Sequence, residues 1–126
     1  MVFNEAMLAL DFVVAAAVDE PPRNDPPASP VIGSAYIVGA APTGDWAGKA
    51  RSLAAFTGGG WRFVSAQDGL TAFVRSTGAR AIYRDGAWQI GSAIASPAGG
   101  TTVDAEARSA IGLILSALVS HGLVAG

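Results

Sequence analysis

Two short stretches decide how the middle of this chain folds, YRDGAW at residues 83–88 and FTGGGW at residues 56–61. Each places an aromatic residue five positions before a tryptophan, with glycine in between. Glycine supplies the positive φ that tight hairpin turns require, so each stretch predicts a short β-hairpin. The two rings of a stretch then meet across the turn, where an aromatic pair contributes about 0.5–1 kcal/mol.

Working outward from these hairpins, short β-prone runs separated by glycine-containing turns extend over residues 31–92. This pattern predicts a small antiparallel meander of five or six strands. The preceding stretch DEPPRNDPPASP, residues 19–30, holds five of the seven prolines. Because proline fixes φ and lacks an N–H donor, we expect an extended, polyproline-like arm there.

Helical patterns flank the β region on both sides. Residues 3–18 are apolar almost all round, and Asn4 is a suitable N-cap. Near the other end, Thr101 or Thr102 can begin a helix that Gly122 ends. Residues spaced as in a heptad form a seam along this second helix: Ala107, Ile111, Ile114, Leu118 and His121.

The predicted fold class is therefore α+β, with three parts. An N-terminal apolar helix and proline-rich arm occupy residues 1–30, and a small antiparallel β domain occupies residues 31–92. A C-terminal oligomerisation helix lies within residues 101–126. Packing of that last helix on its own sheet is an open alternative, because a seam of about two heptads is short for a coiled coil.

Composition favours self-association. Hydrophobic residues make up 51% of the chain and charged residues only 14%, against about 25% charged in ordinary soluble domains. Exposed apolar surface on that scale is usually covered by a partner, although a high alanine content raises hydropathy without creating a patch. A homo-oligomer is expected, with trimer and pentamer both open. The candidate interface residues are Phe3, Met7, Leu10, Val14, Ile111, Ile114 and Leu118.

Several partner classes are disfavoured. The net charge of −2 and a single lysine argue against nucleic-acid binding. The chain has no cysteine and one histidine, so neither a disulfide framework nor a histidine-rich metal site is expected. The apolar N-terminal run lacks a basic start and contains Glu5 and Asp11, so we predict neither a signal peptide nor membrane insertion, and synthesis in the cytoplasm.

Exposed rings offer the main chemistry that the sequence suggests. A flat indole beside polar side chains suits the apolar face of a sugar, and the candidates are Trp46, Trp61, Tyr83, Asp85 and Trp88. The alternative is that these rings only hold the hairpins in register. The aspartates fall at glycine-flanked turns, where aspartate is a common turn former. We therefore predict no catalytic residue, no cofactor and no metal.

A set of motifs in order along the chain resembles one known family. They are Asn4-Glu-Ala with Leu10-Asp11, Pro26-Pro-Ala-Ser-Pro30 with Gly33, Tyr36-Ile-Val-Gly39, Thr43-Gly-Asp-Trp-Ala-Gly48, Gly60-Trp61 and Tyr83 with Gly86-Ala-Trp88. The set is similar to a domain of formerly unknown function carried in alphaproteobacterial prophage and gene-transfer-agent structural clusters. The likeness covers about residues 4–90, and residues 103–123 resemble the C-terminal tails of phage fibre and spike subunits.

This resemblance implies a virion-like structural protein on the surface of a phage-like particle, such as a gene-transfer-agent head spike or fibre component. Its implied partners are copies of itself, a capsid vertex or spike fibre, and the capsular polysaccharide of a recipient cell. It implies no catalytic residues. The chain ends soon after the resembling domain, so a spike base or adaptor role is expected alongside direct glycan recognition.

Overall fold

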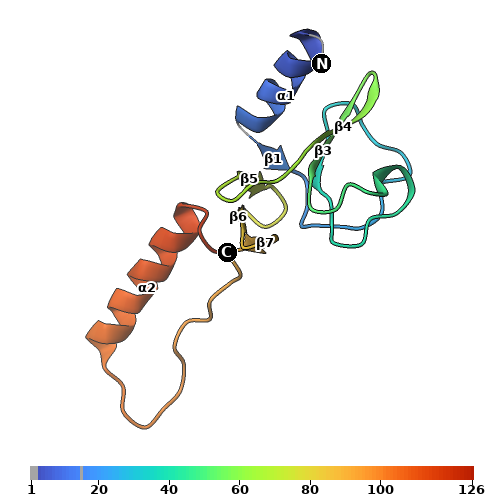
Figure 1. The fold of residues 1–126 in the computed structure, drawn as a ribbon. Coiled ribbons are helices and arrows are strands. Elements are labelled where there is room, and N and C mark those ends of the chain that lie inside the picture. The colour runs from blue at the N-terminus through green and yellow to red at the C-terminus, as the bar shows by residue number, and fades with distance from the viewer. Residues whose placement is uncertain (1–2, 15) are drawn as a thin grey trace.

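A computed structural model describes residues 3–14 and 16–126. The α+β prediction is confirmed: two helices flank seven strands (Figure 1). The elements, in chain order, are α1 (Phe3–Val14), β1 (Ala17–Val18), β2 (Ala35–Ile37), the 3₁₀ turn η1 (Gly44–Trp46), β3 (Leu53–Thr57), β4 (Gly60–Val64), β5 (Thr71–Val74), β6 (Ala79–Arg84), β7 (Ala87–Ile90) and α2 (Ala105–Ser120).

The strands form two sheets rather than the single meander that the sequence predicts. One sheet has the order β1-β5-β6-β7 and the other the order β2-β3-β4. All pairs are antiparallel except β1 with β5, which runs parallel. Consecutive strands pair antiparallel within each sheet, as a meander requires, but turn signals fix neighbouring hairpins and not which hairpins share a sheet.

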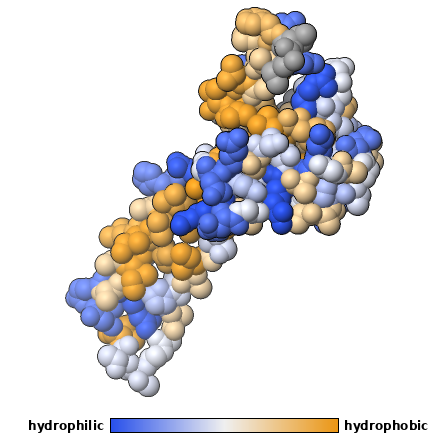
Figure 2. Space-filling model, viewed as in Figure 1, coloured by the Kyte–Doolittle hydropathy of each residue, from blue (hydrophilic) through white to orange (hydrophobic). Residues whose placement is uncertain are grey.

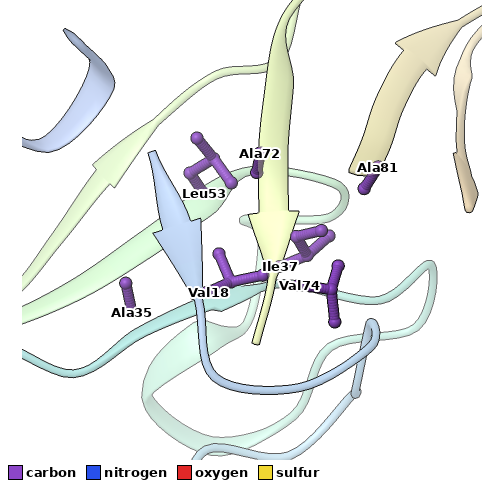
Figure 3. Packing of buried hydrophobic residues seen from close by; sticks show 7 residues of the cluster. All are labelled: Val18, Ala35, Ile37, Leu53, Ala72, Val74 and Ala81. Carbon is purple, nitrogen blue, oxygen red and sulfur yellow. The ribbon is translucent and has the colours of Figure 1, made fainter. Parts of the chain in front are cut away.

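The core lies between the two sheets (Figure 3). Seven buried residues from five strands converge there: Val18, Ala35, Ile37, Leu53, Ala72, Val74 and Ala81. Burial alternates along β5, where Ala72 and Val74 point inward and Thr71 and Phe73 point outward. This period of two is what a strand covered on one face requires.

The predicted N-terminal helix over residues 3–18 is too long. α1 ends at Val14, residue 15 lies outside the described residues, and Ala17–Val18 is a strand with Val18 fully buried. Asn4 already lies inside α1 and does not cap it. The apolar run fits both a helix and a buried strand, and pairing with β5 decides in favour of the strand.

The proline-rich stretch is not a free arm. The Asp19 and Arg23 N–H groups donate to carbonyls of β2, at 2.9 and 3.2 Å, and Gly39 N–H donates to the Arg23 carbonyl at 2.7 Å. A Cβ at Gly39 would lie 2.1 Å from Asn24 Oδ1, so a side chain there would displace the amide that accepts from Ala41 N–H. Part of the predicted linker is therefore built into the β region.

α2 begins and ends at clear signals. Asp104, not Thr101 or Thr102, is the N-cap, and its carboxylate accepts from Ala107 N–H at 2.8 Å. Gly122 adopts φ +67° at the C-terminal end, as predicted. The chain after α2 then returns to the β region, where Gly122 C=O accepts from Arg80 N–H and Ala125 N–H donates to Gly91 C=O. α2 is thus fixed at its C-terminal end and projects away from the sheets (Figure 1).

Candidate functional site

The two aromatic hairpins form as predicted. Phe56 pairs with Trp61 at a ring-centroid distance of 5.0 Å, and Tyr83 pairs with Trp88 at 5.6 Å. Their turns differ, however. Asp85 and Gly86 both have positive φ, as a type I′ turn requires, whereas in residues 57–60 only Gly60 does. The shared spacing thus produces the same ring pairing on two different turns.

Trp46 cannot serve as an exposed sugar platform. Its side chain is fully buried, and its ring lies 5.1 Å from that of Trp61 and 5.7 Å from that of Tyr36. These rings form a second core cluster on the outer side of the β2-β3-β4 sheet. Trp46 was a wrong candidate because the 3₁₀ turn that carries it folds back onto the sheet. Trp61 is half-buried in the same cluster.

Trp88 occupies the most site-like position among the predicted aromatic residues. It is half-buried, and its indole Nε1–H donates to the Arg51 carbonyl at 2.7 Å, across 37 residues of sequence. A shallow cavity of about 200 Å³ lies beside it. This cavity is lined by Pro22, Val38, Gly39, Ala40, Arg51, Ala87 and Trp88. Asp85 is exposed at the turn and does not line this cavity.

The predicted interface residues leave two apolar surfaces uncovered. On α1 the exposed fractions are 78% for Phe3, 48% for Met7, 59% for Leu10 and 80% for Val14; we call these four the α1 stripe. Neither described helix contains a buried residue. Figure 2 shows hydrophobic surface over both helices, with a hydrophilic band between them.

On α2 the uncovered surface is the part of the predicted seam within the helix, which we call the α2 seam: Ala107, Ile111, Ile114 and Leu118. The fifth predicted seam residue, His121, is the C-cap. Ile111 is 41% and Ile114 is 59% exposed, and Leu118 is half-buried. The linker before α2 runs along another side of the helix, where a cavity of about 650 Å³ is lined by Ile94, Gly112 and Leu113, among others. Each helix therefore holds one stripe that no other described part of the chain buries.

Sequence reasoning missed a third surface, on the outer side of the β1-β5-β6-β7 sheet. Alternation along β5, β6 and β7 places one set of side chains there, which we call the arginine face: Thr71, Phe73, Arg80, Ile82, Arg84 and Gln89. Phe73 is 43% and Ile82 is 40% exposed. The arginines looked scattered in the sequence. The signal that could have found them is the alternation within ARAIYR, which puts Arg80, Ile82 and Arg84 on one side of a strand.

Two arginines outside this face form ion pairs with acidic side chains. Arg23 donates to Glu20 at 2.6 Å and to Asp25 at 2.8 Å. Its hydrogen bond holds the pKa of the Asp25 carboxyl below the usual range, and the two partners raise the pKa of Arg23. Arg75, just beyond β5, pairs with Asp19 at 2.6 Å.

Two further findings concern the described residues. No group of three or more His, Cys, Asp or Glu side chains lies close enough there to hold a metal ion. Neither α1 nor α2 combines the length and hydropathy that a helical membrane span needs.

Comparison with known proteins gives one match. Residues 3–89 match the family described as protein of unknown function DUF2793, and this span runs from α1 into β7. Searches of curated proteins and of solved structures give no significant match. Because the matched residues make up more than half of the chain, the protein belongs to the DUF2793 family.

Proposed function

We propose that this protein is a non-enzymatic structural component of a phage-like particle, a gene-transfer-agent head spike base or short fibre. Copies of the chain assemble into a homo-oligomer, trimer or pentamer, on the particle surface, and the oligomer contributes to attachment to the recipient cell. The likeness of its motifs to domains in prophage and gene-transfer-agent structural clusters supports a place on such a particle. DUF2793 membership over residues 3–89 agrees with the span of that likeness.

The observation that carries the proposal is the pair of uncovered stripes on α1 and α2. Isolated helices shorter than about 12–15 residues are marginal in water; α1, with 12 residues, lies at this limit, and α2, with 16, is only slightly longer. Most helical stability in proteins comes from packing an apolar face. Self-association supplies that packing here, and the β region then becomes the part displayed or used as a socket.

Light scattering after size-exclusion chromatography tests the assembly. The wild-type chain is expected at a multiple of its 12.6 kDa mass. Ile114→Asp, in the α2 seam, should shift the mass toward the monomer. Leu113→Asp is the matched control, since Leu113 is 71% exposed but lies on the linker side of α2. A wild-type monomer at micromolar concentration would contradict the assembly.

Binding to particles tests the proposed location on a phage-like particle. The purified oligomer is mixed with capsids and, separately, with tail particles, and each mixture is sedimented. We expect the wild-type chain to pellet with one particle type and Ile114→Asp to stay in the supernatant. Recovery of the oligomer in every supernatant would remove the particle role while leaving the assembly intact.

A second candidate function is capsular-polysaccharide binding, and the cavity beside Trp88 favours it. Trp88 offers a partly exposed ring, and the charged residue Arg51 lines the same cavity. Titration with capsular polysaccharide should quench tryptophan fluorescence in the wild type and not in Trp88→Ala. Trp61→Ala is the matched control and should still respond. An unchanged spectrum of the wild type at saturation would end this candidate.

A further inference from the structure

Arg51, which lines the cavity beside Trp88, has an unusual backbone conformation. Among the described residues, positive φ occurs at ten glycines and at only two other residues, Arg51 at +63° and Asp85 at +52°. Asp85 lies in a type I′ turn, where aspartate is common. Turn chemistry gives no such reason for an arginine at position 51, because this region disfavours residues with a Cβ and suits glycine.

The backbone of Arg51 is held on both sides of its Cα. Its N–H donates to the Gly39 carbonyl at 3.2 Å, and its carbonyl accepts from Trp88 Nε1–H at 2.7 Å. These contacts tie the loop before β3 to the chain just after β2 and to β7. Residues held in sparsely populated conformations cluster at ligand sites. A glycine would make the same two hydrogen bonds, so the bonds alone do not account for an arginine here.

The Arg51 guanidinium is available to an anion. Arg51 is exposed and enters no ion pair in the described part of the chain. The acidic residues on either side of Pro22, another lining residue, are paired with Arg23: Glu20 at 2.6 Å and Asp25 at 2.8 Å. Among the described residues that line the cavity, Arg51 alone is charged, so the charge brought to it is positive.

The other lining residues suit the apolar face of a sugar ring. Trp88 supplies part of an indole ring, and Pro22, Ala40 and Ala87 are exposed residues with apolar side chains around it. The cavity volume of about 200 Å³ lies below the roughly 300–1,000 Å³ of drug-sized ligand sites. One sugar unit is therefore the largest group that the cavity would take, with the rest of a polymer outside it.

We infer that the cavity takes a carboxylated sugar unit of an acidic polysaccharide, with the Arg51 guanidinium donating to the carboxylate. This inference rests on the second candidate function, polysaccharide binding beside Trp88, and names the class of sugar. The argument for this class is charge complementarity. A guanidinium forms charge-assisted hydrogen bonds with a carboxylate, and its paired donors match the two carboxylate oxygens. A neutral sugar would leave the cation without a counter-ion.

Two polymers that differ only in charge test the inference. Polygalacturonate is a chain of uronic acids, and its methyl ester has the same sugars and linkages without the negative charge. Each is titrated into the wild-type chain, and quenching of tryptophan fluorescence gives the affinity. We expect the acid to bind at least about tenfold more tightly than the ester. The net charge of −2 offers an acidic polymer no general attraction, so this preference would come from a local cation.

Arg51→Gly removes the guanidinium without disturbing the turn. Glycine adopts φ +63° freely, so the denaturant midpoint should not fall, while the affinity for polygalacturonate should drop to that for the ester. Arg51→Lys keeps the charge but not the paired donors and should keep part of the preference. Arg62→Gln is the matched control, because Arg62 is exposed on β4 and does not line the cavity. This variant should keep the wild-type preference.

The outcomes separate this inference from the candidate function on which it rests. Equal wild-type affinities for the two polymers, or an Arg51→Gly variant that keeps the preference, overturns the inference. Trp88-dependent binding of capsular polysaccharide without binding of polygalacturonate also overturns it and leaves polysaccharide binding standing. No response to any of the three polymers removes both. A preference for the acid that Arg51→Gly loses and Arg62→Gln keeps supports the inference.

Discussion

The β region and the two helices place their apolar side chains in opposite ways. The β region holds all eleven of the buried hydrophobic residues among those described, including Trp46 and Leu53. The helices bury none, although α1 and α2 are rich in large apolar residues. We propose that this difference separates two roles, with the sheets stabilising the fold and the helices serving assembly with other copies.

The largest expected effect contrasts a sheet leucine with a helix leucine. Leu53→Ala removes a fully buried side chain between the sheets and should cost about 2–5 kcal/mol of unfolding free energy. Leu113→Ala, at a side chain that is 71% exposed and off the α2 seam, should cost less than about 0.5 kcal/mol. Urea unfolding followed by tryptophan fluorescence measures both. Equal losses would remove the distinction between the two regions.

The next effect compares the two hairpin turns inside the β region. Gly86→Ala places a side chain at φ +76° and should cost about 1–2 kcal/mol. Gly58→Ala should be close to neutral, because Gly58 does not have a positive φ and a Cβ there meets open space. Denaturant midpoints report the difference. A large loss at Gly58 would show that the two turns are more alike than their backbone angles indicate.

A smaller effect concerns the contact that ties β7 to the loop before β3. Trp88→Phe keeps a ring but loses the hydrogen bond to the Arg51 carbonyl, which should cost about 0.5–1.5 kcal/mol. Trp61→Phe is the control, since no hydrogen bond of its indole is found among the described contacts. If both substitutions lower stability equally, the hydrogen bond is not what matters at Trp88.

The smallest effect is a pH dependence in the stretch between β1 and β2. Arg23 lowers the pKa of Asp25 in the folded chain, so this pair stabilises the fold above the unfolded pKa of about 3.9. The stabilisation is lost as the pH falls through the lower, folded pKa. In Arg23→Gln the Asp25 pKa should rise toward its usual range. An NMR titration measures it, and an unchanged Asp25 pKa would contradict the assignment.

Local signals predicted much of the fold. Asp85-Gly86 fixed one hairpin, and Gly122 fixed the end of α2, because each depends on the backbone angle of one or two residues. The strand at Ala17–Val18 was missed because its partner, β5, lies more than fifty residues away in the sequence. The division into two sheets was missed for the same reason.

The candidate sites divide along similar lines. Exposed residues of the α1 stripe could be chosen from helical spacing, since helix faces follow from sequence alone. The burial of Trp46 depends on how η1 folds over a sheet, and the arginine face depends on which strands are neighbours. Both require tertiary structure, so the sequence analysis offered Trp46 as a ligand residue and did not single out Arg80 or Arg84.

The mass of the wild-type chain in solution, compared with that of Ile114→Asp and Leu113→Asp, tests the central claim most directly. We predict a defined multiple of 12.6 kDa for the wild type and for Leu113→Asp, and a shift toward the monomer for Ile114→Asp. Circular dichroism of the three proteins verifies that the β region remains folded. A folded wild type with the mass of one chain at micromolar concentration would contradict the claim that the helices serve assembly.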